Sequence, residues 1–145
     1  NQRRRAVMKL RKALRSLNDK TIGILGISFK PNTDDIRDAA AIEIIHLLQN
    51  EGAHIQAYDP QAMENASKAL KNVKLCENPC QVAENADALV LATEWNEFKQ
   101  LDFSRVKELM RQPVILDGRN LWDAENMANF GFLYMGVGRG NLKGN

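Results

Sequence analysis

The stretch TIGILGISFKPNTDDIRDAA, residues 21–40, decides the fold of this chain. Residues 21–27 are almost continuously apolar, as expected of a strand that is buried on both faces of a parallel sheet. A polar turn follows, and residues 39–50 then show helical spacing, with Ile42, Ile45 and Leu48 on one side. A buried strand followed by a turn and an amphipathic helix predicts the first half of a βαβ unit.

The same alternation continues toward the C-terminus. Further strands are predicted at residues 54–58, 87–92, 114–116 and 132–135, and further helices at 62–70, 79–85, 104–110 and 123–130. Residues 73–75 could add a short extended segment. The predicted fold class is therefore α/β, a Rossmann-like doubly wound parallel sheet of about five strands with right-handed crossovers.

A basic amphipathic helix is predicted at residues 1–17, before the sheet begins. Its apolar positions have helical spacing and are Val7, Leu10, Leu14 and Leu17. Its basic positions are Arg3, Arg4, Arg5, Lys9, Arg11, Lys12 and Arg15. The helix starts without a methionine or a capping residue, which suggests the end of a longer helix. A solvated helix face is favoured over docking onto an acidic partner or nucleic acid.

Composition favours one domain in the cytoplasm. The 145 residues carry a formal net charge of +2, which is too balanced to predict a nucleic-acid surface. No apolar run is long enough to predict a membrane span, and no leader is visible, so a soluble protein is expected. Cys76 and Cys80 lack further ligands for a metal site and are expected to be ordinary thiols rather than a disulfide. We expect an N-terminal helix at 1–19, one domain at 20–139 and a flexible tail at 140–145.

Ligand-binding residues are expected directly after the strands, because parallel sheets bind ligands at their carboxyl edge. After the first strand the glycine pattern of a dinucleotide site is missing, since Gly23 and Gly26 both lie within the apolar run. A self-sufficient NAD domain is therefore not expected. The same loop offers Lys30 and Arg37, and a cation beside a helix N-terminus can hold a phosphate. Alternatively, Lys30 is merely solvated, and Asp34 and Asp35 cap the helix.

A second cation follows the strand at 114–116, in the turn Asp117-Gly118-Arg119-Asn120. Arginine suits bidentate phosphate recognition. If the first and fourth predicted strands are neighbours, Lys30 and Arg119 flank the same crevice and could grip a diphosphate together. A structural ion pair is the alternative role for Arg119.

Other polar and aromatic positions are interpreted as structural. Trp95 and Phe98 are expected to pack in the core rather than to stack on a cofactor. Asp59 stands where NAD domains grip a ribose, but without the glycine loop it is interpreted as a turn residue. His46 and His54 have no matched catalytic partner in the sequence.

Four segments together resemble the C-terminal domain of the UDP-glucose/GDP-mannose dehydrogenase family. They are GISFKPNTDDIRDAA (26–40), EGAHIQAYDP (51–60), DALVLATEWNEF (87–98) and DGRNLWD (117–123). The resemblance extends over roughly residues 1–139, and the TEW-x-EF and DGRN motifs favour the UDP-glucose branch. One departure is Asp38-Ala39-Ala40, where many members have Glu-Ser-Pro.

The resemblance implies a division of labour between two domains. In the family, an N-terminal Rossmann domain binds NAD and carries a catalytic cysteine, and the C-terminal domain binds the nucleotide of UDP-glucose. The complete enzymes oxidise UDP-glucose to UDP-glucuronate in two NAD-dependent steps, through a thiohemiacetal and a thioester. This chain lacks the cysteine motif, so neither of its cysteines inherits that role, and we expect no catalysis by the chain alone.

The resemblance also assigns roles to residues. Phe29, Lys30 and Arg119 are implied to contact UDP-glucose, and Arg37 is implied to approach NAD from across a domain cleft. The helix at 1–17 matches the end of a central helix that forms a dimer interface in the family, so a homodimer is expected. A non-catalytic dimerisation or scaffold module of a nucleotide-sugar dehydrogenase is the alternative function.

Overall fold

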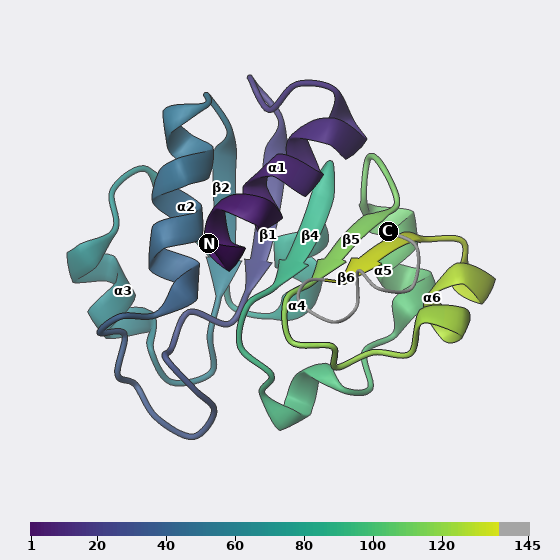
Figure 1. Ribbon diagram of the computed structural model, residues 1–145. Helices are drawn as coiled ribbons and strands as arrows, with labels where there is room; N and C mark the ends of the chain where they lie inside the picture. Colours follow the sequence, from purple (N-terminus) through teal and green to yellow (C-terminus); the bar gives the residue numbers. More distant parts are fainter. Residues whose placement is uncertain (137–145) are drawn as a thin grey trace.

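The computed structural model describes residues 1–136, which form a six-stranded, wholly parallel sheet (Figure 1). The strand order is β3-β2-β1-β4-β5-β6, as in doubly wound dinucleotide-binding folds. The strands are β1 (Thr21–Leu25), β2 (His54–Tyr58), β3 (Val73–Leu75), β4 (Ala88–Leu91), β5 (Val114–Asp117) and β6 (Leu133–Gly136). The predicted fold class is confirmed, and the short segment at 73–75 is a true strand.

Helices cover both faces of the sheet. The helices are α1 (Gln2–Leu14), α2 (Ala40–Asn50), α3 (Met63–Ala69), α4 (Pro79–Ala83), α5 (Phe103–Leu109) and α6 (Ala124–Phe130), with a 3-10 turn η1 (Asn96–Phe98). Figure 1 shows α1 and α2 in front of the sheet and α4 and α5 behind it. The molecule therefore has three layers, helices, sheet and helices, which bury both faces of the parallel strands.

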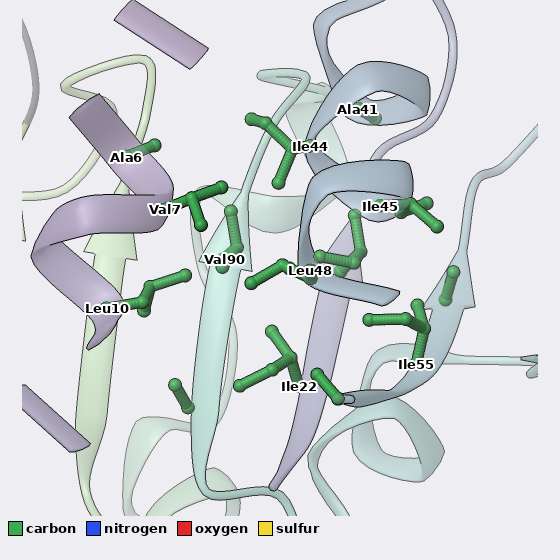
Figure 2. Close-up of a cluster of buried hydrophobic side chains, with 14 of the residues drawn as sticks. Ala6, Val7, Leu10, Ile22, Ala41, Ile44, Ile45, Leu48, Ile55 and Val90 are labelled. Carbon is green, nitrogen blue, oxygen red and sulfur yellow. The ribbon is translucent and has the colours of Figure 1, made fainter. Parts of the chain in front are cut away.

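Alternation along each strand divides the core into two clusters. In β1, Ile22 and Ile24 face α1 and α2, whereas Leu25 belongs to the cluster that contains Phe103 and Trp122. Figure 2 shows Val7 and Leu10 of α1 with Ile44, Ile45 and Leu48 of α2 around Ile22 and Val90 of the sheet. Because both sides of β1 are buried, its sequence is apolar at successive positions.

Helix α1 confirms the predicted apolar side and corrects the prediction of its start. Val7, Leu10 and Leu14 are buried, but the helix does begin with a cap, because the side chain of Asn1 accepts a hydrogen bond from the amide of Arg4 at 2.8 Å. Asparagine is one of the preferred N-cap residues, and the sequence prediction did not assign it this role. Helix α1 ends at Leu14, since Arg15 has a φ of 72°.

The condition that the first and fourth predicted strands are neighbours is not met. Strand β1 lies between β2 and β4, and the predicted fourth strand, which is β5, lies beyond β4. The short strand β3 pairs with β2, and the chain then crosses back to place β4 on the other side of β1. Strand order depends on these crossovers, which local sequence patterns do not encode. One strand therefore separates the loop that carries Lys30 from the loop that carries Arg119.

Two further expectations concern the chain as a whole. Within residues 1–136, none of the helices combines the length and apolar character needed to cross a bilayer. The predicted tail at 140–145 and the predicted domain end at 139 lie outside the described residues.

Candidate site at the carboxyl edge of the sheet

All strands end at the same edge, and the loops that carry the predicted site residues leave from it (Figure 1). The loop after β1 contains Phe29 and Lys30, the segment after β4 contains Glu94, and the loop after β5 contains Arg119. The N-terminal ends of α1 and α2 lie at this edge as well (Figure 1). Exposed helix N–H groups and the helix dipole favour anions there.

A buried carboxylate ties together the segments that follow β1, β2 and β4. Asp59 is 0% exposed, and its Oδ2 accepts hydrogen bonds from the amides of Ile27 (2.7 Å) and Ser28 (2.8 Å) and from the Ser28 hydroxyl (2.9 Å). The same oxygen accepts a bond from the indole of Trp95 at 3.1 Å. The amides of Gln61 and Ala62 donate to Oδ1. Asp59 is thus a turn residue, as predicted, and both of its carboxylate oxygens accept hydrogen bonds from the protein itself.

Hydrogen bonding determines the charge of this carboxylate. Burial alone would raise the pKa of Asp59, but four backbone N–H groups, led by Ser28 and Ile27, outweigh burial and lower the pKa. The lowered pKa keeps the buried group ionised at neutral pH.

The crevice between β1 and β4, where doubly wound folds bind dinucleotides, is closed by close packing. Gly26 has a φ of 90°, and a Cβ placed on it would lie 2.5 Å from the Cβ of Thr93. The hydroxyl of Thr93 donates to the carbonyl of Ser28 at 2.7 Å, and both residues are buried. Gly26 therefore serves contact between two loops rather than approach to a cofactor pyrophosphate.

A second buried carboxylate holds the loop after β5. Asp117 accepts bonds from the amides of Arg119 (3.0 Å) and Trp122 (2.8 Å) and from the hydroxyl of Tyr134 (2.6 Å). The indole of Trp122 donates to the carbonyl of Phe98, which belongs to the segment after β4. These bonds fix the backbone from which the Arg119 side chain extends.

Arg119 forms a bidentate ion pair with Glu94. Its Nε and Nη2 lie 2.9 and 3.2 Å from the two oxygens of that carboxylate. Burial alone would raise the pKa of Glu94, but the hydrogen bond from Arg119 helps to lower it. The predicted structural ion pair therefore exists, and its partner Glu94 was missed. A guanidinium has five N–H donors, so the pair leaves donors for a second ligand.

Arg119 also lines a cavity of about 200 Å³ at this edge. The walls are the ends of β4 and β5, with Gly118, and the first turns of α1 and α2, with Arg3. Two arginines and two helix N-terminal ends thus surround one cavity, which favours an anionic ligand.

Phe29 and Lys30 lie on the surface of the loop after β1. The phenyl ring of Phe29 is unusually accessible, since the residue is 53% exposed, while its amide is anchored to the carbonyl of Asp35 at 2.7 Å. Lys30 is exposed. Neither residue lines the cavity beside Arg119. The convergence of Lys30 and Arg119 on one ligand stays a prediction.

Arg37 is held by Asp35 in a bidentate pair, with Nε–Oδ1 and Nη2–Oδ2 distances of 3.0 and 2.8 Å. The hydrogen bonds from Arg37 lower the pKa of Asp35 to about 2, and the positive charge of Lys30 adds to this effect. Arg37 lines a separate, open cavity of about 540 Å³ with Asn65 and Lys68. The structure therefore brings Arg37 and Arg119 to different cavities.

Two smaller expectations are decided by the same loops. Asp34 and Asp35 do not cap α2, because the helix starts at Ala40 after Ala39, which makes no side-chain cap bond. The alternative that gave them a capping role is wrong, since the loop continues for several residues before the helix. Trp95 and Phe98 are 6% and 0% exposed, so their predicted role in packing is confirmed.

The cysteines are free thiols in different environments. Cys76 is buried, and burial raises its pKa, which disfavours the reactive thiolate. Cys80 is exposed. Over residues 1–136, no three side chains of His, Cys, Asp or Glu come together as they would around a metal ion.

The chain is thus a doubly wound α/β domain with Arg37 and Arg119 in the loops at the carboxyl edge of its sheet. Buried Asp59 and Asp117 fix the loops at this edge. The family model for the UDP binding domain of the UDP-glucose/GDP-mannose dehydrogenase family matches residues 23–124, so the chain belongs to this family.

Individual relatives agree with this assignment. The chain is 47% identical to a UDP-glucose 6-dehydrogenase of Rhizobium meliloti over 118 residues, which are 81% of this chain and 27% of that protein. It is 42% identical to the UDP-glucose 6-dehydrogenase TuaD of Bacillus subtilis over 144 residues, which are 99% of this chain and 31% of that protein. The chain therefore spans about three tenths of the length of these relatives.

A solved structure shows the same fold. The UDP-glucose dehydrogenase of the archaeon Pyrobaculum islandicum superposes with a TM-score of 0.79 at 32% identity. The match covers 93% of this chain and 29% of the archaeal one.

Proposed function

We propose that this domain binds the UDP part of UDP-glucose within an NAD-dependent UDP-glucose 6-dehydrogenase. The main support is the family match at residues 23–124, which includes the loops that carry Phe29, Lys30 and Arg119. The same loops meet at the edge where parallel sheets bind ligands. In this proposal the complete enzyme oxidises UDP-glucose to UDP-glucuronate in two steps.

The cations and the aromatic residue have distinct proposed roles. Arg119 would direct the guanidinium donors that Glu94 leaves unused toward the diphosphate, while Lys30 contributes a flexible positive charge. Phe29 offers an exposed ring to the nucleotide. These contacts lie far from the reacting carbon, so they would supply binding energy that orients the sugar.

The catalytic cysteine and NAD belong to another domain in this proposal. The contact between Gly26 and Thr93 supports this division, because this glycine packs against another loop and is not part of a glycine-rich phosphate loop. Arg37 would reach toward NAD from the neighbouring cavity. We also propose that the complete protein is a cytoplasmic homodimer that pairs through the region of α1, where Met8 is 56% exposed.

Titration calorimetry of the chain with UDP tests the proposed site. We expect Lys30→Ala and Arg119→Ala each to weaken UDP binding about tenfold or more, because a hydrogen bond to a charged group contributes ~1.5–3 kcal/mol. Lys71→Ala is a control on an exposed residue just before β3, at the opposite edge of the sheet, and should bind UDP like the unmodified chain. Mixing the chain with UDP-glucose and NAD should yield no NADH.

Two results would contradict the proposal. If UDP produced no heat with the unmodified chain, the scaffold alternative would be favoured. If both alanine variants bound UDP with unchanged affinity, the domain could still bind UDP, but the assigned cations would be wrong.

A further inference from the structure

The Thr93 hydroxyl joins the segment after β4, whose Glu94 pairs with Arg119, to the loop after β1, which carries Lys30. The Thr93 hydroxyl donates to the Ser28 carbonyl at 2.7 Å, although the two residues are 65 positions apart in sequence. Both are almost fully buried, at 1% and 2% exposure. A bond shielded from water in this way holds its geometry more firmly than an exposed one.

Each end of this bond adjoins a proposed binding residue. Ser28 directly precedes Phe29 and Lys30, and Thr93 directly precedes Glu94, which grips Arg119. A displacement of Thr93 relative to Ser28 therefore changes the separation of Lys30 from Arg119.

The surrounding bonds leave the junction little freedom. The indole of Trp95 donates to the Ser28 hydroxyl at 3.0 Å and to Asp59 at 3.1 Å. Gly26 packs against Thr93 without space for a single added methyl group. The segments after β1, β2 and β4 are thus fixed to one another beneath the exposed side chains.

We propose that Thr93 is a positioning residue for UDP binding, which acts through the Ser28 carbonyl to preset the spacing between Lys30 and the Glu94–Arg119 pair. This role rests on the proposed function of the domain. A preset arrangement reduces the ordering cost that the ligand would otherwise meet on binding. Thr93 itself need not touch the nucleotide.

The variant Thr93→Val keeps the shape of the side chain and replaces the hydroxyl with a methyl group. We expect it to weaken UDP binding about three- to tenfold, as measured by calorimetry at a temperature where both proteins are fully folded. Thr21→Val makes the same exchange at the opposite end of β1 and should leave UDP affinity unchanged. A merely structural role would lower the melting temperature but leave the dissociation constant of the folded protein unaltered.

A double variant shows whether Thr93 acts by positioning Lys30 or by contacting UDP directly. In Lys30→Ala, the additional change Thr93→Val should weaken UDP binding less than twofold, because the cation that it positions is gone. Equal losses in both backgrounds would overturn the proposal, and so would unchanged UDP affinity in Thr93→Val alone.

Amide hydrogen exchange tests the coupling without nucleotide. Thr93→Val should speed the exchange of the amides of both Phe29 and Arg119, which bond to Asp35 and Asp117 respectively. If the unmodified chain did not bind UDP, the proposed function would fail, and exchange alone would decide whether the two loops are coupled. Unaltered exchange at both amides would refute the coupling.

Discussion

The two edges of the sheet use buried carboxylates in different ways. At the amino edge, Asp87 is 1% exposed and accepts bonds from the Thr21 amide and from the side chains of Arg111 and Gln112. At the carboxyl edge, the donors to Asp59 and Asp117 among the described residues are neutral amide, hydroxyl and indole groups. A cation helps to neutralise the buried charge at one edge and does not at the other.

This difference explains how the loop backbones at the carboxyl edge can be fixed while their cationic side chains stay accessible to a ligand. Because neutral donors satisfy Asp59 and Asp117, the cations at the carboxyl edge remain at the surface. Arg37 and Arg119 pair there with Asp35 and Glu94, which are partly exposed. Each of these pairs leaves guanidinium donors unused, and those donors can bind a phosphate while the carboxylate stays in place.

The largest expected effect comes from removing the buried acceptor of the carboxyl edge. Asp59→Ala should lower the free energy of unfolding by about 3 kcal/mol or more, because several buried donors lose their partner. Urea unfolding measures this change. Asp34→Ala, an exposed residue of the same edge, should change stability by less than about 0.5 kcal/mol.

The effect of Asp59 should depend on pH. Its pKa is lower in the folded than in the unfolded chain, so its contribution is complete above the unfolded value of about 4. The contribution is lost as pH falls through the folded pKa. The stability difference between the unmodified chain and Asp59→Ala should therefore narrow below about pH 4. A gap that widened in acid would show that the carboxylate is not stabilised in the fold.

A smaller effect is expected at the amino edge. Arg111→Ala should cost about 1 kcal/mol, because the guanidinium is 57% exposed and Asp87 keeps its bonds from Thr21 and Gln112. Thermal unfolding, with Arg105→Ala as an exposed control, measures the difference. A loss as large as that of Asp59→Ala would remove the distinction between the two edges.

The smallest effect on folding is expected for the exposed pair of Arg37 and Asp35. Arg37→Gln should return the pKa of Asp35 from about 2 toward its ordinary value, because the hydrogen bonds from the guanidinium are lost. An NMR titration of the Asp35 carboxyl carbon follows this shift, while the fold should stay intact. A pKa that remained near 2 would mean that another group holds this carboxyl ionised.

Much of the fold could be predicted because buried parallel strands have a distinctive pattern. The strand His54–Tyr58 was predicted at its observed bounds, and most helix bounds differ by one or two residues. The order of the strands could not be read, because each crossover can return to either side of the sheet. The condition under which Lys30 and Arg119 would flank one crevice, that the first and fourth predicted strands are neighbours, is therefore not met.

The candidate site was predicted in part. The loop positions of Phe29, Lys30, Arg37 and Arg119 follow from strand ends, and the structure places all four at the carboxyl edge. Their roles in binding stay predictions. The pairing of Arg119 with Glu94 was missed, because the two residues are 25 positions apart and nothing in the local sequence marks them as partners.

The sequence by itself determined an α/β domain with a parallel sheet and assigned its polar loops to one edge, because side-chain periodicity reports local burial. Only the tertiary structure decided that β4 lies beside β1, and that Thr93, Ser28 and Asp59 close the crevice between them. The physical reason is that these bonds join residues 31 and 65 positions apart, and they form only when strand order and register bring the loops together.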